Sequence, residues 1–321
     1  MLDHVPRDVL LSILTKLDTA SLLIVATTCR ALRDAANDVR SLRPHVTLKN
    51  RDAFLRWIVS RQNAPRVTVL RVSRAISPPP LHTLDWLGTL ENLRSFISAF
   101  CRVPSTLFQA LPTTALLNLH IHQLSPGTND VFSTRLVSKF TKLRRLHISF
   151  APGWTLAIVG PGLDALTHLE TFELRRVPAV AIIDPIPATS HVALHAFDVM
   201  SSQIPVAPYA TSLRLECDDA PIATLEEMLG VRSTKLSSLV IGSTGMLRVP
   251  YLYDMIHLKH LHIWTTIYCF PDLDRLPCLQ KLRIDVDSSL VFDQTSSLPP
   301  SIHSVNVTAQ GTPIDVYEYL S

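Results

Sequence analysis

The sequence contains few cysteines, few glycines and few charged residues, and each shortage excludes a class of protein. Its five cysteines are scattered, odd in number and without a C-x-x-C pair, so neither a disulfide framework nor a structural zinc site is expected. The sequence contains only nine glycines but 23 prolines. This ratio predicts stiff breaks between secondary-structure elements instead of flexible linkers. Charged residues make up 18% of the chain and the net charge is +3. The sequence therefore lacks the basic footprint of a nucleic-acid-binding protein.

Long apolar runs are missing as well. No stretch approaches the ~20 apolar residues of a transmembrane helix, and the charged residues Arg7, Asp8, Lys16 and Asp18 argue against a secretory leader. Hydrophobic residues nevertheless make up 47% of the 321 residues, which indicates a large buried core instead of disorder. We therefore expect no membrane partner, and a cytoplasmic and/or nuclear protein with reduced thiols.

Catalytic motifs are also missing from the sequence. It contains no G-x-G-x-x-G, no phosphate-binding glycine loop, no G-x-S-x-G and no H-E-x-x-H. Among thirteen histidines, His120, His122 and His147 could lie close together on neighbouring strands, but no carboxylate or cysteine recurs near them at ligand spacing. Gly160-Pro161-Gly162 predicts a turn. We expect no metal, no cofactor and no enzymatic activity.

Residues 5–38 predict three short helices. Pro6 suits a first helical position, and Asp18 is a natural N-cap for a second helix. In the first helix, apolar side chains recur at helical spacing, at Val9, Leu10, Ile13, Leu14 and Leu17. A unit of about 40 residues seldom buries enough surface to be stable alone, and this one has more apolar side chains than three helices can hide. The surplus must pack on the rest of the chain or on a partner.

The stretches from Val5 to Asp18 and from Cys29 to Ala36 resemble an F-box. They share its hydrophobic-Pro opening, its Ile-Leu-x-x-Leu helix and its Cys-Arg-x-hydrophobic-Arg helix, with Val5 in place of the usual leucine and Leu32 where many members have tryptophan. The resemblance implies docking onto a Skp-type adaptor, which bridges to a cullin-RING complex. The adaptor-binding residues that it implies are Val5, Pro6, Val9, Leu10, Ile13, Leu14, Leu17, Leu22, Val25, Cys29 and Leu32.

The rest of the chain repeats the template L-x-x-L-x-[ILV], as in Leu143–Ile148 and Leu258–Ile263. The second hydrophobic position of the template falls at residues 70, 96, 119, 146, 172, 197, 213, 239, 261, 282 and 305. These ten intervals cover 235 residues, so the mean period is 23.5 residues, within the range of leucine-rich repeats. Alternate side chains of each strand point inward, and only stacked neighbours can bury them.

The array resembles the irregular leucine-rich repeats of fungal-type F-box proteins, although their asparagine ladder is mostly absent. We predict an α/β chain with a short three-helix F-box at residues 1–45 and a leucine-rich-repeat solenoid, a horseshoe of about 11 repeats, at residues 46–321. A first strand is expected at residues 45–50 and outer helices at residues 53–60, 131–140, 156–166 and 222–229. The 16-residue step between positions 197 and 213 leaves room only for a bare turn.

The residues between the inward anchors should line the concave face of the horseshoe. A face this long suits a protein or peptide better than a small molecule, and mixed charge beside a tryptophan is typical of interaction surfaces. The candidate substrate-binding residues are Arg145, His147, Glu173, Arg175, Arg214, His262, Trp264 and Arg283.

The resemblance and the repeats together favour a non-catalytic substrate-recognition subunit of an SCF-type cullin-RING E3 ubiquitin ligase, with an unknown protein substrate. Two alternatives stay open. The chain could bind the adaptor without delivering substrates for ubiquitination, or it could be a leucine-rich-repeat scaffold or inhibitor whose N-terminal helices only cap the array.

Overall fold

A computed structural model describes most of the chain from residue 85 onward and parts of the N-terminal region. The described residues are 6–14, 16, 24, 25, 27, 32, 45–48, 67–72, 85–186, 189–201, 207, 209–217, 235–247, 255–269, 273, 275–291 and 298–315.

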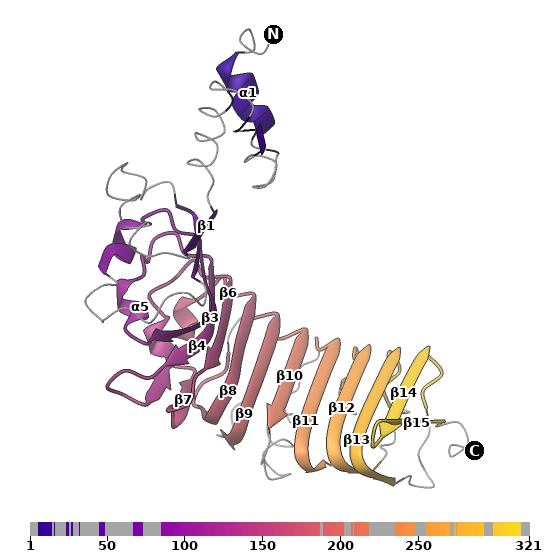
Figure 1. The fold of residues 1–321 in the computed structure, drawn as a ribbon. Coiled ribbons are helices and arrows are strands. Elements are labelled where there is room, and N and C mark those ends of the chain that lie inside the picture. Colours follow the sequence, from indigo (N-terminus) through magenta and orange to yellow (C-terminus); the bar gives the residue numbers. More distant parts are fainter. Residues whose placement is uncertain are drawn as a thin grey trace.

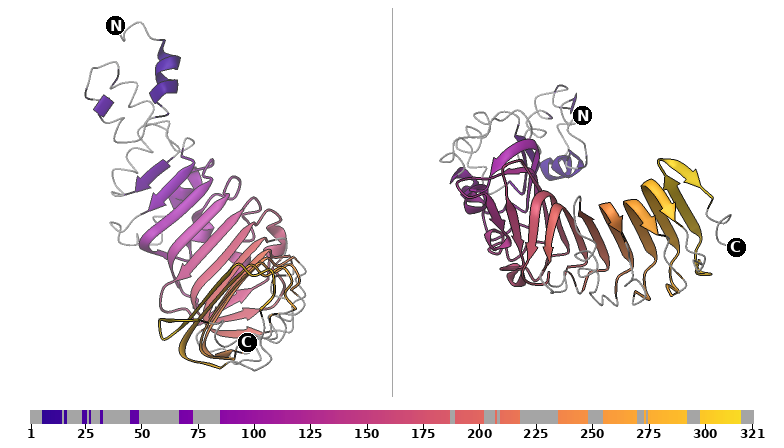
Figure 2. Two further views of the ribbon diagram at one scale, coloured as in Figure 1. Left: turned by 90° about the vertical axis from the view of Figure 1, so that its right-hand side faces the viewer. Right: turned by 90° about the horizontal axis from the view of Figure 1, so that it is seen from below.

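Most of these residues belong to one long, mainly parallel sheet (Figure 1). Its main ladder runs through β1 (His45–Leu48), β2 (Val69–Val72), β3 (Ser95–Pro104), β4 (Asn118–Ser125), β6 (Arg145–Phe150), β8 (Thr171–Ile182), β9 (His191–Ser201), β10 (Ser212–Cys217), β11 (Ser238–Leu247), β12 (His260–Cys269), β13 (Lys281–Val291) and β14 (Ser304–Ala309). A short last strand, β15 (Thr312–Ile314), pairs antiparallel with β14. Two views at right angles show that the sheet follows an arc (Figure 2).

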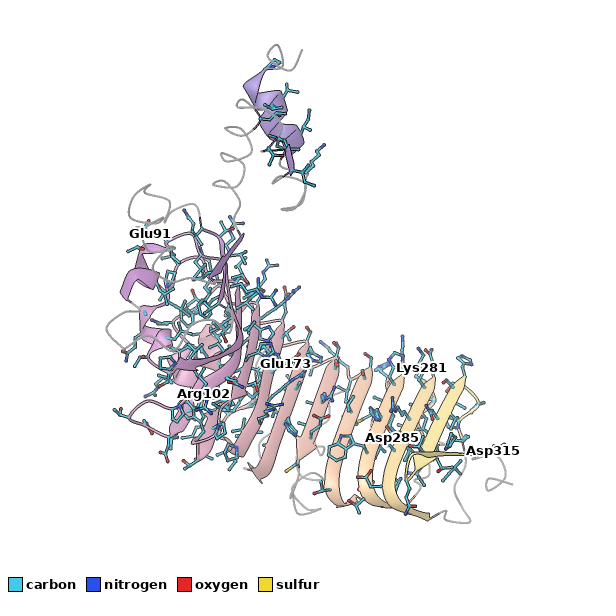
Figure 3. The ribbon with its side chains drawn as sticks, in the orientation of Figure 1. Glu91, Arg102, Glu173, Lys281, Asp285 and Asp315 are labelled. Carbon is cyan, nitrogen blue, oxygen red and sulfur yellow. The ribbon has the colours of Figure 1, made fainter. Side chains whose placement is uncertain are left out.

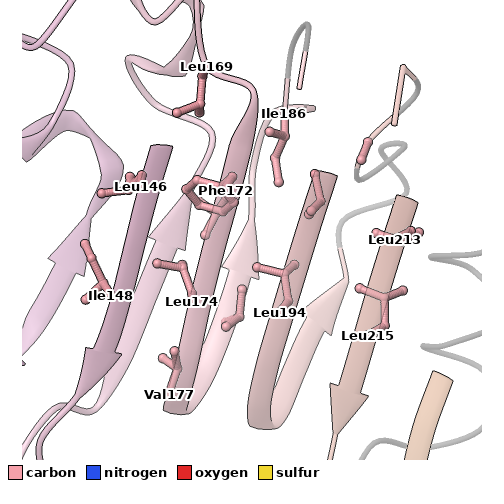
Figure 4. Close-up of a cluster of buried hydrophobic side chains, with 14 of the residues drawn as sticks. Leu146, Ile148, Leu169, Phe172, Leu174, Val177, Ile186, Leu194, Leu213 and Leu215 are labelled. Atoms are coloured by element: carbon pink, nitrogen blue, oxygen red, sulfur yellow. The ribbon is translucent and has the colours of Figure 1, made fainter. Parts of the chain in front are cut away.

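The repeated template determines this register, because its second hydrophobic position lies opposite its counterpart on each neighbouring strand. The aligned residues are Leu70, Phe96, Leu119, Leu146, Phe172, Val192, Leu213, Leu239, Leu261, Leu282 and Val305. All except Val305 are buried. Figure 4 shows how these side chains stack from strand to strand around Phe172. Burying one leucine or phenylalanine in such a stack contributes about 1.5–3 kcal/mol.

One predicted anchor is wrong. The repeat template predicts Phe197 as the anchor of this strand, but Val192 occupies the anchor position, opposite Phe172 and Leu213. In the correct register, the first hydrophobic position of this repeat is occupied by Thr189, a buried polar residue. Because the template requires an apolar residue there, it does not match the sequence at this register. The neighbouring intervals are therefore 20 and 21 residues, so the predicted 16-residue step does not exist.

The outer layer also differs from the prediction. Residues 131–140 and 156–166 were expected to be helices, but they form strands β5 (Val131–Ser133) and β7 (Leu156–Val159), each followed by a single 3₁₀ turn, η5 (Thr134–Leu136) and η6 (Leu163–Ala165). β5 pairs with β7, and β7 pairs with the second half of β8. Short apolar segments fit a period of two as well as a period of 3.6, and pairing with β8 decided between them. The other two expected helices, residues 53–60 and 222–229, lie outside the described residues.

The described residues are therefore mostly β, solenoid-like and poor in helix. Their helices include α1 (Arg7–Leu14), α5 (Leu107–Ala110) and the 3₁₀ turns η4 (Asp85–Thr89), η5 and η6, and residues 24, 25, 27 and 32 are also helical. This share of helix is smaller than the predicted α/β class implies. The three-helix arrangement, the number of repeats and the boundary at residue 45 stay predictions. Within the described part of the chain, no helix has the length and apolar character needed to cross a membrane.

Aromatic side chains fill the corner between the sheet and the outer layer. Phe132, Phe150 and Trp154 make edge-to-face contacts with ring centroids 5.2–6.1 Å apart, a geometry that aromatic rings favour. The buried Trp154 Nε1 donates a hydrogen bond of 2.7 Å to the carbonyl oxygen of Leu124. This cluster fixes the outer strands against the long sheet, and the opposite face of the sheet stays open.

Candidate functional site

Helix α1 has an exposed apolar stripe, formed by Pro6, Val9 and Ile13. Val9 is 49% exposed and Ile13 is 53% exposed, and Pro6 is also exposed. On the adjoining face of the helix, Leu14 is buried and Leu10 is half-buried. Residues spaced three and four apart lie on one helix face, so the sequence spacing produces two adjoining apolar faces, one buried and one exposed to solvent. Figure 1 and Figure 2 show α1 standing away from the sheet.

The other predicted adaptor-binding residues are only partly described. Leu32 is buried and Val25 is half-buried, whereas Val5, Leu17, Leu22 and Cys29 lie outside the described residues. Ile24, which the prediction omitted, is 70% exposed. Its side chain adds to the apolar surface that the N-terminal region shows to solvent.

The second candidate surface is the open face of the sheet, opposite the buried anchors. We define the open face by three rows of residues in register across the strands. The first row contains Asn118, Arg145, Thr171, His191, Ser212, Ser238, His260, Lys281 and Ser304. The middle row contains Arg71, Ile97, His120, His147, Glu173, Ala193, Arg214, Val240, His262, Arg283 and Asn306. The third row contains Arg175 on β8 and, past the irregularity that shifts the register between β8 and β9, His195, Glu216, Gly242, Trp264, Asp285 and Thr308.

All eight predicted substrate-binding residues lie in these rows, so the structure places them on one face. Glu173, Lys281 and Asp285 mark that face in Figure 3. The prediction missed His191 and Glu216, which belong to charged clusters on this face. The i, i+2 spacing of Arg214 and Glu216 along one strand is the sequence signal that could have found one of these clusters.

Glu173 is the centre of the first cluster. Its Oε2 atom lies 2.7 Å from His147 Nδ1 and 3.0 Å from a terminal nitrogen of Arg175, and its Oε1 atom lies 3.5 Å from His191 Nε2. Hydrogen bonds from His147 and His191 hold the pKa of Glu173 well below its ordinary value, although burial opposes the shift. Because three neighbours surround it, the carboxylate is only 16% exposed.

Two further clusters repeat this arrangement. Asp285 Oδ2 lies 2.7 Å from Arg283 Nε and 2.9 Å from His262 Nε2, and Thr308 donates to its other oxygen. Burial acts to raise the pKa of Asp285, but these hydrogen bonds outweigh it and the pKa is lowered. On β10, Glu216 accepts a hydrogen bond of 2.9 Å from Arg214 Nε. In each cluster an acidic side chain lies beneath a more exposed arginine on the same strand.

Three histidines form a stack beside the Glu173 cluster. The ring centroid of His120 lies 4.8 Å from that of His122 and 4.1 Å from that of His147. Burial, reinforced by His147 and His122, lowers the pKa of His120 to about 4, and burial likewise lowers the pKa of His122. The close packing of these rings therefore favours uncharged His120 and His122 near neutral pH. Among the described residues, no group of histidine, cysteine and carboxylate side chains has a geometry that could hold a metal ion.

Trp264 lies over Gly242 on the neighbouring strand. A Cβ atom built on Gly242 would stand 1.8 Å from Trp264 Nε1 and 1.9 Å from Trp264 Cε2, so only glycine leaves room for the indole there. The sequence showed Trp264 as a candidate but did not show why the position opposite it is glycine.

Replacing Gly242 with alanine should therefore displace the Trp264 indole toward solvent, with a loss of about 1 kcal/mol of stability. We expect a red shift of the tryptophan emission and faster acrylamide quenching. The double variant Gly242→Ala with Trp264→Phe is the control, because it lacks the responding indole. An unchanged spectrum in Gly242→Ala would contradict the contact.

Comparison with known protein families gives one match. Residues 2–49 match the F-box-like family. No curated protein sequence matches the chain.

Three solved structures illustrate what the chain resembles. A chain of the Toll–Spatzle complex from Drosophila is 15% identical, with a TM-score of 0.41, over 78% of this chain and 38% of that chain. Internalin C2 from Listeria monocytogenes is 11% identical, with a TM-score of 0.33, over 77% of this chain and 83% of that chain. The LRR protein LIC12759 from Leptospira interrogans is 11% identical, with a TM-score of 0.24, over 72% of this chain and 86% of that chain.

This chain thus spans less than two fifths of the length of the Drosophila chain. Membership in the fungal-type F-box and leucine-rich-repeat family stays a prediction. The chain combines an F-box-like match over residues 2–49 with a mostly β, solenoid-like fold of its described residues.

Proposed function

We propose that the chain is a non-catalytic substrate-recognition subunit of an SCF-type cullin-RING E3 ubiquitin ligase. In this proposal the N-terminal region binds a Skp-type adaptor, and the open face of the sheet binds a protein substrate. The cytoplasmic and/or nuclear location and the absence of nucleic-acid and membrane partners belong to the same proposal.

The observation that carries the proposal is the F-box-like match over residues 2–49 together with the exposed stripe of α1. Isolated hydrophobic side chains are common on surfaces, but a stripe of this kind on a short helix is a usual docking feature. Pro6, Val9 and Ile13 occupy positions that the F-box resemblance assigns to the adaptor. The open face supplies the second binding surface that a receptor needs.

Ile13→Asp should abolish adaptor binding without unfolding the chain. Ile13 is 53% exposed, so a carboxylate is tolerated in the free protein, but it would be desolvated against an apolar partner at a cost of about 3 kcal/mol, or roughly 100-fold in affinity. The measurement is co-precipitation and titration of the purified chain with a Skp-type adaptor.

Two controls belong to this experiment. Ile13→Leu keeps the apolar contact and should bind normally. Ile183→Asp makes the same change at a similarly exposed isoleucine, 45% exposed, at the end of β8, and should also bind normally. Wild-type protein that does not bind the adaptor, or Ile13→Asp that binds as well as wild type, overturns the proposal.

The second candidate function is adaptor binding without substrate delivery, and it shares the exposed stripe of α1. Reconstitution of the chain with adaptor, cullin, RING subunit and charged ubiquitin-conjugating enzyme separates the two. A protein captured by the open face becomes ubiquitinated under the first function and stays unmodified under the second.

A further inference from the structure

The open face of the sheet presents positive charge outward and negative charge inward. In the three clusters the side chains of Glu173, Glu216 and Asp285 are 16%, 16% and 24% exposed. The arginines that cover them are 48%, 46% and 57% exposed, in the order Arg175, Arg214 and Arg283. A partner that approaches this face therefore meets guanidinium groups before it meets carboxylates.

Positive charge also exceeds negative charge on this face. Its cations are Arg71, Arg145, Arg175, Arg214, Lys281 and Arg283, and its acids are Glu173, Glu216 and Asp285. Each acid is already neutralised by a neighbour. Arg71, Arg145 and Lys281 are exposed and have no carboxylate partner among the described residues. Their charge is available to a ligand.

The three rows of the open face differ in charge. Five of the six cations lie in the first and middle rows, which contain only one of the three acids, Glu173. The third row contains Arg175 together with the acids Glu216 and Asp285. The most basic strip therefore runs along the first and middle rows, across the strands.

We infer that this strip binds an acidic, extended segment of a protein, which lies across the strands along the first and middle rows. The inference rests on the proposed function and names the chemistry of the substrate that the open face receives. An acidic segment is complementary in charge to this strip, because the cations of the open face are exposed to solvent. Its acids are less exposed and are already paired with neighbouring side chains.

The spacing of the arginines favours a polypeptide over a nucleic acid. Strands lie about 4.8 Å apart, so Arg214 on β10 is separated across three strands, or roughly 14 Å, from Arg145 on β6 and likewise from Arg283 on β13. An extended peptide advances about 3.3 Å per residue, so acidic residues about four apart would meet successive arginines. A nucleic-acid strand carries one charge per ~3.4 Å, which is far denser than this face can neutralise.

The test uses the full chain and a fluorescein-labelled peptide of about 15 residues, which spans roughly 50 Å when extended. Its glutamates recur every three or four residues among serine and alanine. The lysine counterpart of this peptide and a single-stranded oligonucleotide of equal length are the comparison probes. Fluorescence anisotropy at low salt and at ~0.15 M ionic strength measures the affinities.

The glutamate peptide should bind, and its affinity should fall as salt is added. Arg145→Glu combined with Lys281→Glu should weaken it about ten-fold, because each reversal replaces an attraction by a repulsion. The matched control, Arg135→Glu combined with Lys142→Glu, makes the same charge change at exposed residues outside the open face and should alter the affinity less than about two-fold. A melting curve confirms that both double variants are folded.

Four results would overturn the inference: no binding of the glutamate peptide, equal binding of the lysine peptide, tighter binding of the oligonucleotide, or no difference between the two double variants. Adaptor binding is measured on the same preparations. If the adaptor binds and the glutamate peptide does not, the inference fails and the proposed function stands. If the peptide binds and the adaptor does not, the proposed function fails and the acidic-ligand surface stands.

Discussion

Replacing Gly160 with alanine should lower the free energy of unfolding by about 4 kcal/mol, the sum of backbone strain and steric overlap. Gly160 has a φ of +122°, a conformation that residues with a Cβ atom rarely adopt. An added Cβ atom would stand 2.5 Å from the Asp184 amide nitrogen and 2.9 Å from its carbonyl oxygen. Both contacts are to backbone, so neither can be relieved by a side-chain rotation.

The Gly160→Ala substitution should destabilise mainly the outer layer of the solenoid. Gly160 follows β7, and its amide nitrogen donates to the buried Thr134 Oγ1, which in turn donates to the carbonyl oxygen of Pro161. A shift of this turn therefore disturbs the connection between β7 and η5. Urea unfolding followed by circular dichroism measures the change in midpoint.

Gly311→Ala is the matched control. Gly311 also has a positive φ, +75°, but nothing lies within 4 Å of an added Cβ atom. Its substitution should cost only about 1 kcal/mol, which is the backbone term alone. If both variants lose the same stability, the overlap with Asp184 is absent and the turn at Gly160 differs from the structure.

Glu173→Gln should cause the second largest loss of folding stability, about 2 kcal/mol at pH 7. The amide cannot accept charge-assisted hydrogen bonds from His147, Arg175 and His191 together. Because the pKa of Glu173 is depressed in the folded state, its carboxylate stabilises the protein above the unfolded pKa near ~4.3, and this contribution is lost as the pH falls below that value. The difference between wild type and Glu173→Gln should therefore shrink below about pH 4.

His120 adds a second acid-sensitive contribution at higher pH. The pKa of His120 falls from 6.5 to about 4 in the folded protein, so between these values the unfolded chain binds the proton more readily. Stability therefore declines as the pH falls from about 6.5 toward 4. Melting temperatures of wild type, Glu173→Gln and His120→Phe across this range separate the two contributions, because His120→Phe removes only the upper part of the decline.

Glu170→Gln is the control for Glu173. Glu170 lies 3.5 Å from Arg144, and its side chain is 50% exposed, so its loss should cost less than about 0.5 kcal/mol at any pH. Equal effects of Glu170→Gln and Glu173→Gln would contradict a special environment for Glu173.

The sequence by itself determined the register of most of the sheet. Leucine or another apolar residue at every second position of a strand needs a neighbour to bury it, and a period near 23 residues supplies one. The template thus predicted that Arg145, His147, Glu173 and Trp264 share one open face. It failed at Val192, because a buried threonine broke the pattern there and Phe197 offered a competing frame.

Only the tertiary structure decided the outer layer and the charge arrangement. Short apolar segments such as residues 131–140 fit either period, and pairing between β5, β7 and β8 selected strands. Likewise, the sequence shows that Glu173 and Arg175 are two residues apart, but not that the glutamate is largely buried and the arginine exposed. The burial of Glu173 depends on His147 and His191 from adjacent strands, which approach it only when the strands are in register. The position of a residue in the strand determines on which face of the sheet its side chain lies. Residues distant in sequence determine how far that side chain is buried, its ionisation and its hydrogen-bond partners.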